Sequence, residues 1–189
     1  DSDIIPKYNY EKSEDEFSGT YKDVQIDLFE TRLLKGSGQY QTTPFKGIVI
    51  NLSMNKYFKS KTVIRKNKKV LNLFRGKSSD LQRVKLEDPK FEDIFNVYSQ
   101  DQIESRYLIT TSFMERLMDL VDSFNGQSIE CSFYDNKLLM MISVKENLFE
   151  PGSIYESEDF VDDSKKLLKE LNMIFRIIDV LKLDDNIGM

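Results

Sequence analysis

The densest group of side chains capable of chemistry lies between residues 98 and 106. It combines a phenol, a hydroxyl, two carboxylates and a guanidinium, from Tyr98, Ser99, Asp101, Glu104 and Arg106. Such a group can form a polar pocket that binds a small ion. In the alternative, Ser99 caps a helix, Asp101 complements the helix dipole, and Glu104 or Arg106 pairs with a neighbouring element. We favour this structural interpretation.

The chain contains no histidine, and this absence excludes most catalytic chemistry. The usual general base, the Ser–His and Cys–His pairs and the commonest metal ligand are all missing. Only all-oxygen sites for Mg²⁺ or Ca²⁺ are left to consider. Glu87, Asp88, Glu92 and Asp93 place four acids in seven residues, but EF-hand spacing is absent and Asp88 is expected to cap a helix. We therefore expect no catalytic residue, no metal and no cofactor.

The single cysteine is expected to be buried and inert. Cys131 shares strand parity with Ile129 and Phe133, which places its thiol on the inward face of a strand. With one cysteine there is no internal disulfide, so nothing points to an oxidising compartment. No phosphate-binding glycine motif occurs, and no apolar run approaches the roughly 18 residues of a membrane span.

A basic segment interrupts an acidic chain. The net charge is −5, yet residues 56–85 carry eleven Lys or Arg and one acid, a local charge of +10. Alternation along a strand would place Lys61, Val63 and Arg65 on one face and the residues between them on the other. The residues of this candidate patch for an anionic partner are Lys56, Tyr57, Phe58, Lys59, Lys61, Arg65, Lys66, Lys68 and Lys69.

Three function classes fit the basic segment. The first is a non-enzymatic binding or scaffold domain, with the segment on an anionic membrane surface or a protein partner and with Tyr57 and Phe58 at the interface. The second is a nucleic-acid-binding module, which the sequence pI of about 5.0 and the lack of a known binding motif disfavour. The third is a histidine-free enzyme that uses Asp and Glu, with or without Mg²⁺.

Hydrophobic periodicity predicts an α+β fold with a largely antiparallel sheet built from hairpins. Tight turns are expected at Lys22-Asp23 and Asp135-Asn136. A loop is expected over residues 36–44 and a helical turn over residues 70–74. Strands are predicted over residues 17–22, 24–34, 45–55, 61–66, 83–87, 96–99, 128–134 and 137–144.

Short helices are predicted from their caps. Asp88 followed by Pro89 predicts one, and the pairs Ser99–Gln102 and Ser112–Glu115 form capping boxes that predict two more, the second over Phe113–Phe124. A long helix is predicted over Glu158–Leu183. Its apolar residues exceed one core stripe, so we expect it either to lie between other elements or to form a homodimer through its extra apolar face.

Residues 85–117 resemble the characteristic string of a bacterial family of unknown function, number 3137. Further stretches, FSGTYKDVQIDLFETRL, FKGIVINLSMNKYFKSKTVI, YDNKLLMMI and NLFEP, extend the resemblance over roughly residues 17–151. Ser105 and Thr111 stand where the family usually has alanine and proline. The matching positions are Leu86, Glu87, Asp88, Pro89, Phe91, Glu92, Phe95, Val97, Tyr98, Ser99, Asp101, Glu104, Arg106, Tyr107, Met114 and Glu115.

The resemblance implies a soluble domain carried behind one or two N-terminal membrane helices, and it implies no activity. On this basis residues 1–16 are expected to be a polar lead-in at the end of a linker from a membrane anchor. Residues 17–189 are expected to form one globular α+β domain. The expected location is the cytoplasmic face of the inner membrane.

Overall fold

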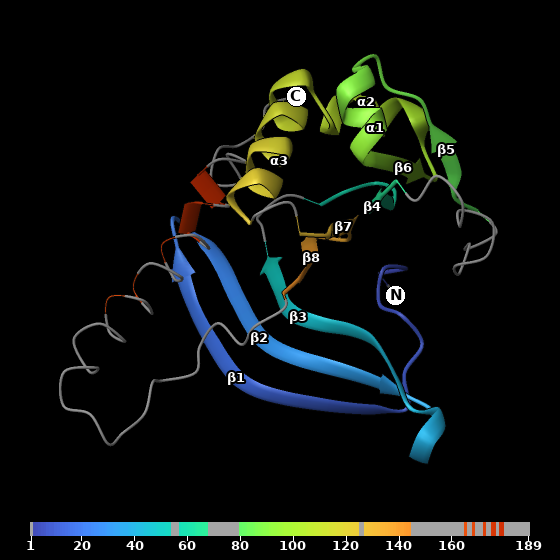
Figure 1. Ribbon diagram of the computed structural model, residues 1–189. Helices are drawn as coiled ribbons and strands as arrows, with labels where there is room; N and C mark the ends of the chain where they lie inside the picture. Colours follow the sequence, from blue (N-terminus) through green and yellow to red (C-terminus); the bar gives the residue numbers. More distant parts are fainter. Residues whose placement is uncertain are drawn as a thin grey trace.

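The computed structural model describes residues 2–53, 57–67, 80–124 and 127–144, together with seven helical residues between 165 and 179. Figure 1 shows a large curved sheet whose helices lie on one face. The elements are β1 (Tyr10–Tyr21), β2 (Val24–Lys35), a 3-10 turn (Gly38–Tyr40), β3 (Thr42–Ser53), β4 (Thr62–Lys66), β5 (Gln82–Val84), α1 (Pro89–Ile94), β6 (Phe95–Ser99), α2 (Gln102–Leu108), α3 (Thr111–Ser123), β7 (Ile129–Tyr134) and β8 (Lys137–Ser143).

The sheet has eight strands in the order β1-β2-β3-β8-β7-β4-β6-β5. Every neighbouring pair is antiparallel. The predicted antiparallel sheet with short inserted helices is thereby confirmed. Both predicted tight turns are also present, with positive φ angles at Lys22, Asp23 and Asp135. Such angles match the twist of two-residue hairpins.

The first strand begins at Tyr10, and the sequence placed its start seven residues too late, at Phe17. Residues 10–16 are polar because β1 is an edge strand that is mostly exposed. Charged side chains on an edge strand discourage pairing with another chain. The opposite edge, β5, has three residues, fewer than the predicted strand 83–87. The predicted helical turn over residues 70–74 lies outside the described residues.

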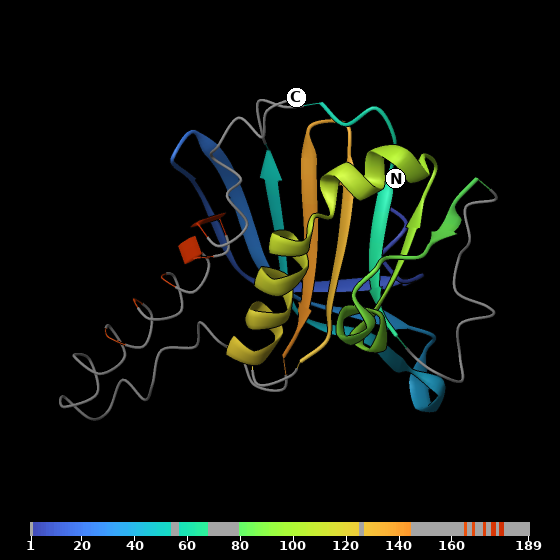
Figure 2. The same ribbon diagram turned by 90° about the horizontal axis from the view of Figure 1, so that it is seen from above.

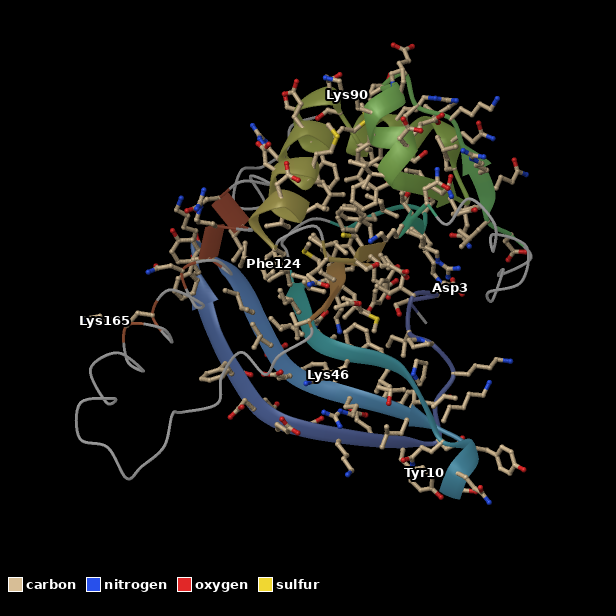
Figure 3. The ribbon with its side chains drawn as sticks, viewed as in Figure 1. Asp3, Tyr10, Lys46, Lys90, Phe124 and Lys165 are labelled. Atoms are coloured by element: carbon tan, nitrogen blue, oxygen red, sulfur yellow. The ribbon has the colours of Figure 1, made fainter. Side chains whose placement is uncertain are left out.

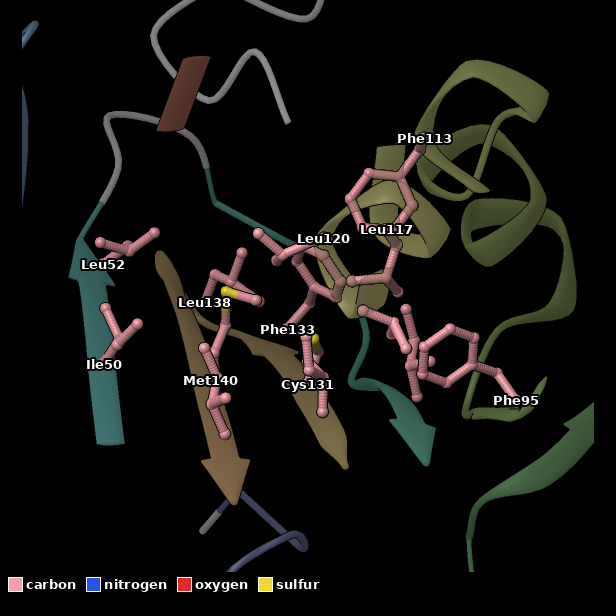
Figure 4. Close-up of a cluster of buried hydrophobic side chains, with 14 of the residues drawn as sticks. Ile50, Leu52, Phe95, Phe113, Leu117, Leu120, Cys131, Phe133, Leu138 and Met140 are labelled. Atoms are coloured by element: carbon pink, nitrogen blue, oxygen red, sulfur yellow. The ribbon is translucent and has the colours of Figure 1, made fainter. Parts of the chain in front are cut away.

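The main core lies between the sheet and the three helices. Alternate residues of the strands point toward α3, whose buried stripe includes the predicted Met114, Leu117, Val121 and Phe124. Figure 4 shows Phe113, Leu117 and Leu120 of α3 above the strand residues Phe133, Leu138 and Met140. Burial of this apolar surface is the main contribution to stability.

The central strands are buried on both faces. In β8 the five residues Leu138 to Ile142 are all buried, although alternate side chains point in opposite directions. The face away from the helices carries a second apolar cluster, which we call the back-face cluster. Its buried members are Ile4, Leu33, Phe45, Val49, Val63, Leu139 and Met141. In Figure 2 the helices lie over one face of the sheet. The strands β1 to β3, which belong to the same sheet, curve so that part of them passes behind its central strands.

The predicted long helix over residues 158–183 falls mostly outside the described residues, so no continuous C-terminal helix is seen. Among its described residues, Ile178 is buried, and the Phe175 ring stacks on Tyr21 with centroids 4.8 Å apart. Lys22 Nζ forms an ion pair with Asp179 at 2.9 Å. The hydrogen bond from Lys22, with a smaller one from Tyr21, lowers the pKa of Asp179. Phe175 therefore packs within the domain, and homodimerisation through other residues of this segment stays a prediction.

Gly47 is required where β3 approaches β8. Its φ is +153°, and a Cβ there would lie 2.1 Å from the carbonyl oxygen of Ile142. That oxygen belongs to the backbone at the sheet centre, so it cannot move aside without breaking the strand pairing of Gly47 with Ser143.

Replacing Gly47 by Ala should lower the free energy of unfolding by about 2–5 kcal/mol, since the new methyl group collides with backbone. Gly19 is the matched control because a Cβ there meets nothing within 4 Å. Gly19→Ala should change stability by less than about 1 kcal/mol. Urea unfolding of both variants measures the difference. Equal effects would show that the Gly47 backbone adapts.

Candidate functional site

The five residues of the predicted polar pocket take separate positions. Tyr98 and Ser99 are consecutive in β6, so their side chains point to opposite faces of the sheet. Tyr98 lies opposite Val63 and Arg83 on the back face, while Ser99 is fully buried beneath the helices. Arg106 is exposed on α2, where its guanidinium donates to the Gln102 carbonyl at 3.4 Å. These positions do not bring the five side chains around one point.

Ser99 does not cap α2, as the sequence had suggested; Asp101 does. The Asp101 carboxylate accepts from the N–H groups of Ile103 at 2.8 Å and Glu104 at 3.1 Å. The Ser99 hydroxyl instead lies 3.0 Å from the Thr62 hydroxyl and within hydrogen-bonding distance of the Lys61 and Asp101 carbonyls. Ser99 therefore joins β4 to the start of α2 inside the core.

A second predicted cap is also displaced by two residues. Helix α3 begins at Thr111, and the hydroxyl of Thr110 accepts from Phe113 N–H at 3.2 Å. Ser112 lies inside the helix, so the capping box Ser112–Glu115 is wrong. The prediction for α1 is confirmed. Its cap is Asp88, whose side chain accepts from the N–H groups of Lys90 and Phe91, and Pro89 is the first residue of the helix.

Glu104 joins α2 to the loop that precedes β4. Its Oε1 accepts from the backbone N–H of Lys59 at 2.8 Å, and its Oε2 accepts from the Ser60 hydroxyl at 2.7 Å. Hydrogen bonds to a carboxylate are stronger than those between neutral groups. The loop and the helix therefore form one continuous surface, and Glu104 pairs with a neighbouring element as the structural interpretation expected.

Three large side chains on this surface are exposed. Tyr57 has 75% of its area exposed, Ile103 has 68%, and Tyr107 has 74%. Ile103 and Tyr107 are four residues apart and share one side of α2, with Ser105 buried on the other. The exposed cations Lys59 and Arg106 accompany them. We call these five residues, Tyr57, Lys59, Ile103, Arg106 and Tyr107, the loop–α2 surface.

Sequence reasoning included Tyr57 but missed Ile103 and Tyr107. The sequence signal for Ile103 and Tyr107 is their spacing of four residues, which places them on one side of a helix. It could not be used because the bounds of α2 were not predicted. Phe58 was expected at the interface beside Tyr57. It is half-buried, and its ring meets Phe133 edge-on at 5.4 Å, so Phe58 belongs to the core instead.

The remaining basic residues are divided by the faces of β4, as alternation predicted. Lys61 and Arg65 point to the back face, where both contact Asp3. Lys66 points the other way and is exposed. Lys56, Lys68 and Lys69 lie outside the described residues. The described part of the segment is therefore not one planar basic patch.

The described residues offer little for catalysis. Within them, no group of three or more acids, cysteines or histidines could hold a metal ion. Glu92 from the acidic cluster accepts from Leu86 N–H at 2.9 Å. Burial raises the pKa of the Cys131 thiol well above its usual range, and Glu130 adds to this shift. Cys131 is buried, as its strand parity predicted. A fully buried thiol with a raised pKa is a poor nucleophile.

Comparisons with known proteins locate the chain among relatives. The model of a family described as "Protein of unknown function (DUF3137)" matches residues 43–183. No curated protein matches the sequence. Among solved structures, the mycobacterial trehalose monomycolate transport factor A, TtfA, is similar, with 12% identity and a TM-score of 0.48. The match covers 89% of this chain and 73% of that one, and so distant a likeness supports no inference about function. Within the described residues, no helix is both long and apolar enough to cross a membrane.

The helix caps provide a direct stability test. Asp101→Ala and Thr110→Ala should each lower the free energy of unfolding by about 0.5–2 kcal/mol, because helix N–H groups lose their acceptors. Ser112→Ala should change it by less than about 0.5 kcal/mol, because Ser112 is not a cap. Thermal and urea unfolding compare them. A larger loss for Ser112→Ala than for Thr110→Ala would contradict the assignment.

The bridge from Glu104 to Ser60 is suited to a double-mutant cycle. Glu104→Ala, Ser60→Ala and the double variant should show a coupling free energy of about 1.5–3 kcal/mol, the value of a hydrogen bond to a charged acceptor. Additive effects of the two substitutions would mean that the loop is not held by Glu104. The free energies come from urea unfolding at one pH and salt concentration.

Proposed function

We propose that this chain, which belongs to the DUF3137 family of proteins of unknown function, is a non-enzymatic binding and scaffold domain that rests on the anionic cytoplasmic surface of a bacterial membrane. The loop–α2 surface makes the contact. The observation that carries the proposal is the presence there of Tyr57, Ile103 and Tyr107, each more than two thirds exposed. Large apolar side chains exposed on a loop and a helix that Glu104 holds together favour an interaction site over plain solvent exposure.

The residue types of the loop–α2 surface suit a bilayer interface. Tyrosine has an apolar ring and a polar hydroxyl, so it is enriched at the depth of lipid headgroups. Ile103 adds an aliphatic side chain that gains free energy on leaving water. Lys59 on the loop and Arg106 on α2 are both exposed, and each cation near an anionic leaflet contributes about 1 kcal/mol. An anionic bilayer surface therefore suits both the two tyrosines and the two cations.

The two acids near this surface, Asp101 and Glu104, have structural roles. The Asp101 carboxylate accepts helix N–H groups, and the Glu104 carboxylate accepts from the Lys59 N–H and the Ser60 hydroxyl. Lys56 precedes Tyr57 directly in the sequence and adds a further positive charge to the segment. Because Glu104 fixes the loop before binding, little conformational entropy is lost when the surface meets a membrane.

A non-enzymatic function is supported by what the polar side chains do. Ser99, Asp101 and Glu104 are engaged in hydrogen bonds that hold β4, α2 and the loop together. The sequence offers no histidine to act as a base. The nucleic-acid alternative loses support, because Lys61 and Arg65 face away from Lys66 and contact the chain's own Asp3.

Co-sedimentation with vesicles tests the membrane contact. The chain should bind vesicles rich in phosphatidylglycerol more tightly than neutral phosphatidylcholine vesicles, and added salt should weaken binding because it screens exposed charges. Replacing Lys59 and Arg106 together by Gln should weaken binding by about 2 kcal/mol, roughly 30-fold. Tyr57→Ser with Tyr107→Ser should also weaken it several-fold.

Tyr40 provides the matched control for the tyrosine variants. It is 84% exposed but belongs to the 3-10 turn after β2, at the end of that strand opposite the Lys22-Asp23 hairpin. Tyr40→Ser should leave vesicle binding unchanged. Absence of binding to anionic vesicles even at low salt, or an equal loss from Tyr40→Ser, would refute the proposal.

A further inference from the structure

The back-face cluster contains one buried side chain that no strand supplies. Leu33, Phe45, Val49, Val63, Leu139 and Met141 come from β2, β3, β4 and β8. Among the buried members of this cluster that the structure describes, Ile4 alone comes from the segment before β1, and it is 6% exposed. The segment thus inserts one aliphatic residue into an apolar surface made by the sheet.

Two cations beside this cluster hold the neighbouring residue. Lys61 Nζ forms an ion pair with Asp3 Oδ2 at 2.7 Å, and the two side chains are only 18% and 13% exposed. The Arg65 guanidinium donates to the backbone carbonyl of Asp3. Arg65 belongs to β4 and Lys61 directly precedes that strand, so the two cations lie on either side of Val63 of the cluster in the sequence. Figure 3 labels Asp3 on the side of the sheet away from the helices.

The backbone at Asp3 explains how two consecutive side chains reach the same surface. In an extended strand, neighbouring side chains point in opposite directions. Asp3 has φ of +60°, in the left-handed region that Asp and Asn adopt more readily than most residues. This conformation lets the Asp3 carboxylate reach Lys61 while Ile4 enters the cluster. This face of the sheet therefore contacts two consecutive residues, an aspartate and an aliphatic residue.

We propose that Lys61, Arg65 and the back-face cluster form a docking site for a short acidic peptide in which an aspartate precedes an aliphatic residue. Residues 2–4 occupy this site within the same chain. The site is separate from the loop–α2 surface, since Lys61 and Arg65 point to the back face, so the inference does not depend on membrane binding.

The contacts that hold the intramolecular occupant include an ion pair, a guanidinium–carbonyl hydrogen bond and a buried aliphatic side chain. Its advantage over an outside peptide is that it is tethered, which gives it an effective concentration in the millimolar range. An outside peptide of the same chemistry would compete at high concentration, or at low concentration once the tethered segment is weakened. The residues before β1 thus control access to the site.

A labelled peptide with the sequence DSDIIPKY, which copies residues 1–8, probes the site in trans by fluorescence polarisation. The 189-residue chain carrying Asp3→Asn and Ile4→Ser should bind this peptide at least tenfold more tightly than the unaltered chain. Adding Lys61→Glu to that variant should reduce binding at least tenfold. Lys66→Glu is the control, because it makes the same charge change on the opposite face of β4.

A charge exchange adds specificity to the test. A peptide with Lys in place of its second Asp should bind the Lys61→Glu variant better than the original peptide does. If the folded Asp3→Asn, Ile4→Ser variant binds the original peptide no more tightly than the unaltered chain, the proposal is wrong and the segment only closes the core. Equal losses from Lys61→Glu and Lys66→Glu would also overturn it.

A second measurement applies if the double variant does not fold. The unaltered ¹⁵N-labelled chain is titrated with the unlabelled peptide to millimolar concentration. Displacement should move the amide resonances of residues 2–4, whereas the peptide with Asn in place of its second Asp should move them less. Resonances that do not respond to either peptide would overturn the proposal.

Discussion

Burial of both faces of the central strands is the constraint on which the rest of the structure depends. Leu138 to Ile142 is a continuous apolar run, so each face of β8 needs cover. The helices cover one face, and the curved outer strands with Ile4 cover part of the other. Gly47 permits the close approach of β3 and β8 that this arrangement needs. Basic side chains at β4 are consequently divided between the face that receives the N-terminal segment and the helix-covered face, where Lys66 is exposed at the end of the strand.

Because of this division, the described cations of the basic segment lie on two separate surfaces. A charge of +10 over residues 56–85 suggests one electropositive patch, but Lys61 and Arg65 contact Asp3 whereas Lys59 faces outward beside α2. Two surfaces with different chemistry result. One combines exposed tyrosines and cations, which suits a bilayer interface, and the other combines two cations with an apolar cluster, which suits an acidic peptide. Together they underlie the two proposals, a membrane contact at one surface and a peptide contact at the other.

Local patterns predicted much of this fold, and long-range contacts were beyond their reach. The two hairpin turns, the Asp88 cap and the apolar stripe of α3 depend on neighbouring residues, so the sequence contains their signals. The caps at Asp101 and Thr110 were misplaced because several Ser, Thr and Asp residues precede each helix and any of them can accept from a free N–H. A single pocket was one of the two interpretations of the polar group around Tyr98, and it fails because adjacent strand residues point to opposite faces. The Asp3–Lys61 pair spans 58 residues, and no local pattern reports it.

The membrane contact is tested most directly by the fluorescence of one introduced tryptophan. The chain contains no tryptophan, so Tyr57→Trp places a single probe on the loop–α2 surface. With phosphatidylglycerol vesicles, its emission should shift to shorter wavelength and its quenching by iodide should fall, because the ring leaves water. A probe introduced by Tyr40→Trp should show neither change. An emission spectrum at position 57 that anionic vesicles do not alter, or an equal change at position 40, would contradict membrane binding through this surface.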